Sequence, residues 1–188
     1  TSNLIFAENN KKKNNNNKIL YPVTMKNFES IQYLGVEMFY EFLSNLKILE
    51  SISSENSLNI VVKLHPIAAS HIKDIEKIFP KLKFSKEKIS KELKESFVTI
   101  NFSSTTIEDS LYCRVPVILF DQWNRYRHCE STEDPKNIKV PIYYVNNKKD
   151  LITAINTAEK NSNYEFNRFI YDGKSKENIS KTLKNILH

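Results

Sequence analysis

Short apolar runs alternate with segments of helical periodicity along this chain, and no other feature constrains its fold as tightly. The runs at 59–64 (NIVVKL) and 115–120 (VPVILF) are rich in β-branched residues and have the length of buried strands. Between them lie amphipathic segments, of which 35–50 (GVEMFYEFLSNLKILE) is the clearest predicted helix. Because alternating strands and helices build parallel sheets covered on both sides, the sequence predicts an α/β domain with a Rossmann-like parallel sheet and helices on both faces.

The other elements continue this alternation. A run rich in Asn and Lys precedes the first strand, so we interpret residues 1–18 as a flexible polar connector and 19–188 as one folded domain. Further strands are expected at 19–24, 83–84, 97–102 and 142–145. Further helices are expected at 71–79, 86–94, 103–114, 148–160 and 163–187, the last broken near Gly173.

The composition is that of a globular domain with a basic excess. The 188 residues carry a formal charge of +6, and 40% of them are hydrophobic. The lysines are interleaved with acidic residues, as in 73–79 and 86–97, and arginine, the residue best suited to reading bases, is scarce. We therefore expect no nucleic-acid partner. A phosphorylated small molecule or an anionic membrane face accounts for the charge equally well.

The cysteines and glycines of the sequence exclude several kinds of binding site. Cys113 and Cys129 lack the spacing of a disulfide framework or a zinc site, so we expect a cytoplasmic protein with no metal and with Cys113 as a small buried residue. Gly35 and Gly173 are the only glycines. They cannot supply the several glycines of a dinucleotide fingerprint or a phosphate loop. A nucleotide would therefore have to be held without a glycine-rich cradle.

Polar residues stand directly after three predicted strands. His65 and Pro66 follow one strand, a hydroxyl run beginning at Ser103 follows the next, and Asp121 follows a third. A helix N-terminus with hydroxyl side chains can hold a phosphate, and an imidazole can donate to one. The alternative is structural, with one hydroxyl capping the helix and the histidine supporting the strand end. Their occurrence together favours a ligand site, because parallel sheets bind ligands at this edge.

These segments resemble a known group of enzymes. VVKLHP at 61–66 and NFSSTTIEDSLYCRVPVILFD at 101–121 are similar to the paired HP and SS/ST motifs of bacterial surface-polysaccharide transferases. That group includes polysialyltransferases, capsule Kdo transferases and CDP-glycerol glycerophosphotransferases. The resemblance covers about residues 19–145 and implies the C-terminal, donor-binding half of a GT-B glycosyltransferase that makes capsule or lipopolysaccharide.

The resemblance also implies roles for particular residues. His65 would contact the donor phosphate or nucleotide, Pro66 would shape the turn, and Glu108 would reach ribose or sugar hydroxyls. The residues that would bind the phosphate are Ser103, Ser104 and Thr105. Weaker candidates in the following loop are Asp121, Asn124, Arg125, Arg127 and His128. The ligand would be a nucleotide sugar, CMP-, CDP- or UDP-linked, acting as a substrate with no cofactor.

Some parts of the GT-B pattern are missing. There is no DxD motif, which agrees with the metal-independent habit of GT-B enzymes, and Pro116 replaces the second acid of an E-x7-E pattern. The catalytic base of the family comes from the N-terminal half, which the residues before 19 cannot form, so the catalytic residues are unknown. We therefore expect one domain of a larger enzyme, inactive alone, paired with an N-terminal half or partner chain and peripheral to the inner membrane face.

Two other functions remain open from the sequence. A non-hydrolysing UDP-sugar 2-epimerase has a similar C-terminal half, but its crevice would need more acids and histidines. A non-catalytic module that binds a nucleotide or phosphosugar would use the basic surface for a partner. Binding of CMP, CDP, UDP or GDP distinguishes the transferase half from a module that binds only protein.

Overall fold

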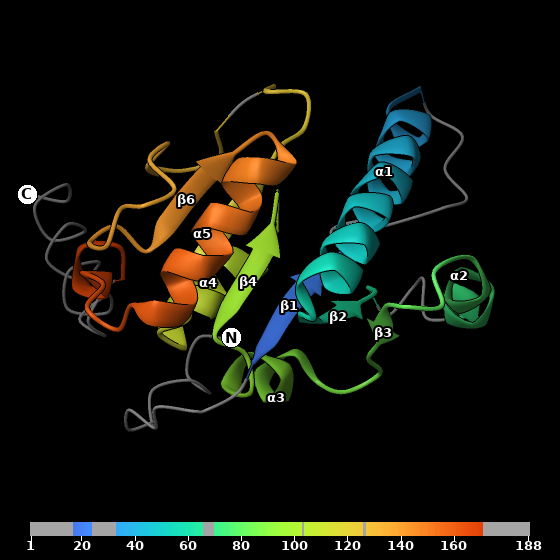
Figure 1. The fold of residues 1–188 in the computed structure, drawn as a ribbon, viewed down its shortest axis with the longest axis horizontal. Helices are drawn as coiled ribbons and strands as arrows, with labels where there is room; N and C mark the ends of the chain where they lie inside the picture. The colour runs from blue at the N-terminus through green and yellow to red at the C-terminus, as the bar shows by residue number, and fades with distance from the viewer. Residues whose placement is uncertain (1–16, 24–32, 66–69, 103, 126, 171–188) are drawn as a thin grey trace, which may run out of the picture.

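The computed structural model describes residues 17–23, 33–65, 70–102, 104–125 and 127–170 (Figure 1). Strands and helices alternate in it as the sequence predicts. The strands are β1 (Lys18–Pro22), β2 (Asn59–Lys63), β3 (Lys83–Phe84), β4 (Val98–Asn101), β5 (Val117–Phe120) and β6 (Ile142–Val145). The helices are α1 (Tyr33–Asn56), α2 (Ile72–Ile78), α3 (Ile89–Lys94), α4 (Thr106–Tyr112), α5 (Lys148–Lys160) and the 3-10 turn η2 (Phe166–Arg168).

The six strands form one parallel sheet in the order β3-β2-β1-β4-β5-β6. In the centre, Ile19 of β1 pairs with Ile60 of β2 on one side and with Val98 of β4 on the other. The chain therefore builds outward from β1 to β3, then returns and builds outward again from β4 to β6. This confirms the predicted Rossmann-like parallel sheet.

Helices cover both faces of the sheet (Figure 1). On one face, α1, α2 and α5 pack on the central strands, with Leu46, Leu49 and Leu151 fully buried. On the other face, α3, α4 and η2 bury smaller clusters, one of them around Leu93. Each fully buried side chain of this size contributes roughly 1.5–3 kcal/mol, so both layers stabilise the sheet.

Several element boundaries differ from the sequence prediction. Helix α1 continues past residue 50 to Asn56 through a polar segment with no apolar periodicity. Strand β5 begins at Val117 rather than 115, because Pro116 has no N–H to donate to the ladder. The predicted helix at 163–187 is wrong where it can be seen, since only the turn Phe166–Arg168 is helical there. Its remainder, from 171, and residues 1–16 of the predicted connector lie outside the described residues.

Candidate functional site

The carboxyl-terminal edge of the sheet carries the segments that the sequence singles out. Because all strands are parallel, the residues after β2, β4 and β5 meet at this edge. His65 lies two residues beyond β2, Ser104 follows β4, and Asp121 follows β5 directly. Strands β2 and β4 flank β1, so the chain reverses its direction across the sheet here, and parallel sheets bind ligands at such a switch point. The predicted gathering of these strand ends is confirmed.

A hydrogen bond to the Ser104 side chain holds the turn that leads into α4. The Ser104 Oγ accepts a hydrogen bond from the Thr106 N–H at 3.3 Å. Thr106 Oγ1 accepts another from Nδ2 of Asn101 at 2.6 Å, which ties the helix to the end of β4. Thr105 and Glu108 are both exposed at this end of the helix. Ser104 therefore has a structural role in addition to any ligand contact, while Thr105 and Glu108 face solvent.

Two other predicted donor contacts, Pro66 and Ser103, lie outside the described residues. His65 is half-buried at the end of β2, directly after Leu64, which is buried in the core. The strand end is thus anchored while the imidazole retains partial access to solvent. Contact of His65 with a ligand stays a prediction.

Asp121 anchors the loop that follows β5. Its side chain is fully buried. One carboxylate oxygen accepts the Arg125 N–H at 2.6 Å and the Tyr144 hydroxyl at 3.0 Å, and the other accepts the Trp123 N–H at 3.3 Å. Hydrogen bonds of this kind satisfy a buried charge. Asp121 therefore holds the loop in shape, a role that the sequence did not indicate.

The guanidinium of Arg125 is enclosed by two carboxylates and two rings. Its Nη2 donates to Oε1 of Glu41 at 2.6 Å, and its Nε donates to Oδ1 of Asp121 at 3.3 Å. Its Cζ lies 4.4 Å from the ring centroid of Phe102 and 5.3 Å from that of Trp123. Charge pairing and ring stacking together fix this side chain in one position.

Burial opposes the charge on both members of the main ion pair. Burial raises the pKa of Glu41, and the hydrogen bond and positive charge of Arg125 reverse only part of this rise. Burial acts against the charge of Arg125 as well, but the hydrogen bonds to Glu41 and Asp121 and the negative charges of these carboxylates together outweigh it and raise the guanidinium pKa. Sequence reasoning missed Glu41. The available signal was an acid on the apolar face of α1, four residues before another buried polar residue, Asn45.

A second polar network joins α1 to the same loop. Nδ2 of Asn45 donates to the Tyr21 hydroxyl at the end of β1, at 3.1 Å, and burial raises the pKa of that hydroxyl. Nε2 of Gln122 donates to Oδ1 of Asn45, and the Ser44 hydroxyl donates to Oε1 of Gln122 at 3.0 Å. The loop after β5 is therefore held against both β1 and α1.

The remaining loop residues are each engaged within the protein. Asn124 adopts a left-handed backbone conformation with φ of 51°, which Asn tolerates better than most residues, and its Oδ1 accepts the Tyr144 hydroxyl at 3.1 Å. Arg127 forms an ion pair with Glu133, and its Cζ lies 5.3 Å from the centroid of the Tyr144 ring. Both side chains thus have partners in the loop.

His128 packs against the ring of Phe102 in the candidate site. Its ring meets Phe102 edge-on, with centroids 5.2 Å apart. Burial and the charge of Arg125 lower the pKa of His128. The structure therefore brings five predicted loop residues together with Phe102 and Glu41, and it places them at the same edge as His65 and Ser104.

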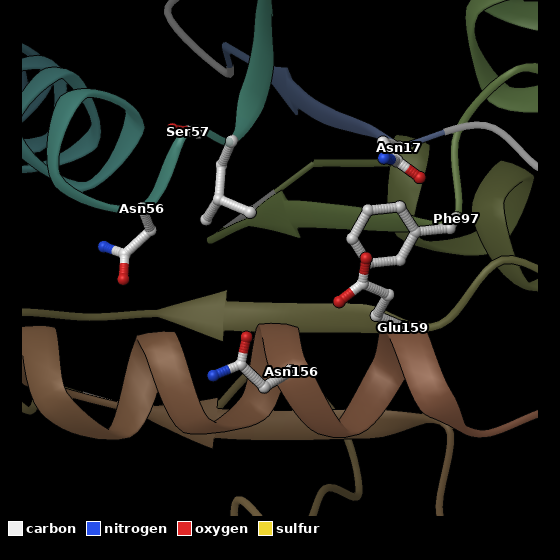
Figure 2. A pocket seen from close by; sticks show the side chains of 7 residues that line it. Asn17, Asn56, Ser57, Phe97, Asn156 and Glu159 are labelled. Carbon is white, nitrogen blue, oxygen red and sulfur yellow. The ribbon is translucent and has the colours of Figure 1, made fainter.

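A pocket of about 280 Å³ opens at the opposite, amino-terminal edge (Figure 2). Amide and carboxylate side chains line it, from the residue before β1, from the end of α1 and from the second half of α5. They include Asn17, Asn56, Asn156 and Glu159. None of the predicted donor contacts that the structure describes lines this pocket. Because parallel α/β sheets bind ligands at the other edge, we give the pocket no part in donor binding.

No group of three or more potential metal ligands occurs among the described residues. Within the same residues, no helix combines the length and apolar character needed to cross a membrane.

The sheet and its polar edge define the class: a Rossmann-like α/β domain of the kind that forms one half of a GT-B fold. The family follows from a model of the LIC12162 family transferase, which matches residues 2–137. This chain belongs to that family of transferases. A comparison with curated proteins finds no match.

Solved structures share the fold at low sequence identity. UDP-GlcNAc 2-epimerase from Methanocaldococcus jannaschii, in complex with UDP-GlcNAc and UDP, is similar with a TM-score of 0.59 and 19% identity, over 89% of this chain and 45% of that chain. Another structure of this epimerase is similar with a TM-score of 0.57 and 18% identity, over 97% of this chain and 49% of that chain. The crystal structure of TarM is similar with a TM-score of 0.52 and 16% identity, over 95% of this chain and 36% of that chain. This chain thus spans less than half the length of these structures.

Proposed function

We propose that this chain binds a nucleotide-sugar donor at the carboxyl-terminal edge of its sheet, as the donor-binding half of a GT-B glycosyltransferase of surface-polysaccharide biosynthesis. The observation that carries the proposal is the sheet order, which places the switch point beside Ser104 and His65 in a member of a transferase family. The epimerase with the same fold was solved with UDP-GlcNAc and UDP, which supports a nucleotide sugar as the ligand class.

In this proposal the donor phosphates meet the start of α4 and the end of β2. Ser104, Thr105 and His65 supply hydroxyl, N–H and imidazole donors, so no metal is needed to bind the charge. Arg125 is already shared between Glu41 and Asp121, and it therefore acts as a positioning residue that keeps the loop in shape. The catalytic base belongs to the other half of the enzyme, and this chain alone does not transfer sugar.

Calorimetric titration of the chain with CMP, CDP, UDP and GDP tests the proposal. We expect one of them to bind, and Ser104→Ala to weaken that binding about tenfold or more, since a hydrogen bond to a charged group is worth roughly 1.5–3 kcal/mol. Ser162→Ala is the matched control, an exposed serine after α5 at the opposite edge. Loss of the Ser104 hydrogen bond to the Thr106 N–H should cost only about 1 kcal/mol of stability, so the fold persists. Unchanged affinity in Ser104→Ala would remove the phosphate role.

An epimerase function is the second candidate, because two of the similar structures are of UDP-GlcNAc 2-epimerase. Incubating the chain with UDP-GlcNAc and following the sugar C2 configuration by NMR tests whether this chain has epimerase activity. The transferase proposal expects UDP-GlcNAc to stay unchanged. Accumulation of the C2 epimer would favour the epimerase instead.

A further inference from the structure

Positive charge is concentrated at one end of the sheet. Residues 70–95, which comprise α2, β3 and α3 with their connections, contain eight lysines and five acidic residues, a formal net charge of +3. The other described residues contain twelve Lys or Arg and thirteen Asp or Glu, a net charge of −1. The basic excess of the described part of the chain therefore lies entirely in this segment, which we call the lysine edge.

The charge of the lysine edge faces solvent. All eight of its lysines are exposed, whereas two of its five carboxylates point to Lys18 at the start of β1: the buried Glu92 and its neighbour Glu95. Local ion pairs engage Lys77 and Lys91 with exposed acids, and such surface pairs are weak. The surface of this edge is consequently more basic than its formal charge indicates.

An apolar side chain projects from the same surface. Ile78, at the end of α2, is 62% exposed, although the next residue, Phe79, is buried in the core. Lys77 precedes it and Lys81 follows it closely, both exposed. An exposed aliphatic residue among lysines can enter the headgroup region of a bilayer while the ammonium groups meet lipid phosphates.

Protection of an edge strand explains only part of this pattern. β3 is the last strand of the sheet, and lysines on such strands prevent pairing with another chain. However, β3 has two residues, of which Lys83 is one, and most of the lysines lie on α2, α3 and the connections. Those helices cover opposite faces of the sheet, so their lysines surround its end rather than shield the strand.

We propose that the lysine edge binds the surface of an anionic phospholipid bilayer. Every cation in it is lysine, and lysine is depleted from protein–protein interfaces. Its two phenylalanines, Phe79 and Phe84, are buried and half-buried, and the segment contains no Tyr or Trp, so it offers no exposed Phe, Tyr or Trp ring for stacking nucleic-acid bases. Electrostatic attraction to lipid headgroups needs neither aromatic side chains nor the bidentate hydrogen bonds of an arginine guanidinium.

Membrane contact at the lysine edge leaves the ends of β4 and β5 accessible. The lysine edge ends the sheet at β3, and two strands lie between β3 and β4 and three between β3 and β5 (Figure 1). Membrane contact at the lysine edge therefore does not cover Ser104 or Asp121. The proposal does not depend on the donor function and can be tested without any nucleotide.

Sedimentation of the full 188-residue chain with vesicles tests this proposal. The vesicles are phosphatidylcholine alone or phosphatidylcholine mixed with phosphatidylglycerol, at low and at physiological salt. One variant replaces four exposed lysines of the edge by Gln: Lys73, Lys81, Lys86 and Lys88. The matched control replaces four exposed lysines elsewhere: Lys136, Lys139, Lys149 and Lys160. The two variants have the same net charge, and circular dichroism verifies that both are folded.

We expect the wild-type chain to sediment with the anionic vesicles and to be released by salt, since screening shortens the Debye length to about 8 Å at physiological ionic strength. Each lysine near such a surface contributes about fivefold, so loss of the four lysines should weaken binding of the edge variant roughly 600-fold, and the control should lose only a few-fold. Ile78→Ser should weaken binding at both salt concentrations. Absent binding at low salt, equal binding to neutral vesicles, or equal losses in the two lysine variants would each overturn the proposal. Binding to RNA but not to vesicles would overturn it too.

Discussion

Replacing Arg125 by Gln should destabilise the protein by about 2 kcal/mol, because it leaves one buried carboxylate without its partner. Glu41 is 7% exposed and depends on the Arg125 Nη2 at 2.6 Å, whereas Asp121 keeps two backbone donors and the Tyr144 hydroxyl. Removing one member of a fully buried pair costs roughly 3–5 kcal/mol, and we reduce this value because the Arg125 side chain is 32% exposed. Adding Glu41→Gln removes the unpaired charge and should restore about 1–2 kcal/mol.

The loss should also depend on pH. Burial raises the pKa of Glu41 in the folded protein, so the stability that protonated Glu41 contributes is present below its unfolded pKa and is lost as pH rises through the folded value. Without Arg125 the folded pKa rises further. The variant should therefore lose less stability near about pH 5 than near about pH 7.5, measured against wild type at the same pH.

Urea unfolding measures both effects. With a slope of roughly 2 kcal/mol per molar urea for a chain of this size, the Arg125→Gln midpoint should fall by about 1 M. Arg168→Gln is the control, since Arg168 pairs with Glu130 at the surface and its loss should cost less than about 1 kcal/mol. Additive losses in the Arg125 and Glu41 variants, with no dependence on pH, would refute the structural role assigned to this pair.

Three further predictions concern other parts of the molecule. Partial burial raises the pKa of the Cys113 thiol to about 11, so iodoacetamide should alkylate it near pH 8 roughly 100-fold more slowly than free cysteine; an equal rate would contradict this rise in the pKa. Tyr164→Phe removes the 2.7 Å hydrogen bond with the Tyr143 hydroxyl and should cost about 1 kcal/mol in urea unfolding; an unchanged midpoint would count against it. EDTA should leave nucleotide affinity unchanged, whereas a loss restored by magnesium would show that metal binds the donor phosphates.

Much of the fold could be predicted from the sequence because its strands are buried on both faces. Buried parallel strands are continuous apolar runs, as at 59–64 and 142–145, and these runs are visible without knowledge of their neighbours. The order of the strands could not be predicted, since a run shows that a strand exists but not which strand lies beside it. The helix predicted at 163–187 was wrong over its visible part, because apolar residues such as Phe166 pack there without a regular helix.

The residues of the candidate site could be predicted only where a polar side chain comes soon after a predicted strand. Ser104, His65 and Asp121 could be found from their positions after apolar runs. The ion pair could not, because Glu41 and Arg125 are far apart in sequence and meet only when α1 packs beside the loop after β5. The stacking of Arg125 on Phe102 is also a product of tertiary packing.

The central position of β1 has a consequence for synthesis of the protein. One edge of β1 is paired as soon as β2 has been made, but the other waits for β4, where Ile19 pairs with Val98. Until the ribosome has passed residue 101, a nascent chain carries an apolar strand with one open side, and such strands associate with other chains. Shortened forms that end between β3 and β4 should therefore aggregate, while those that include β4 should remain dispersed.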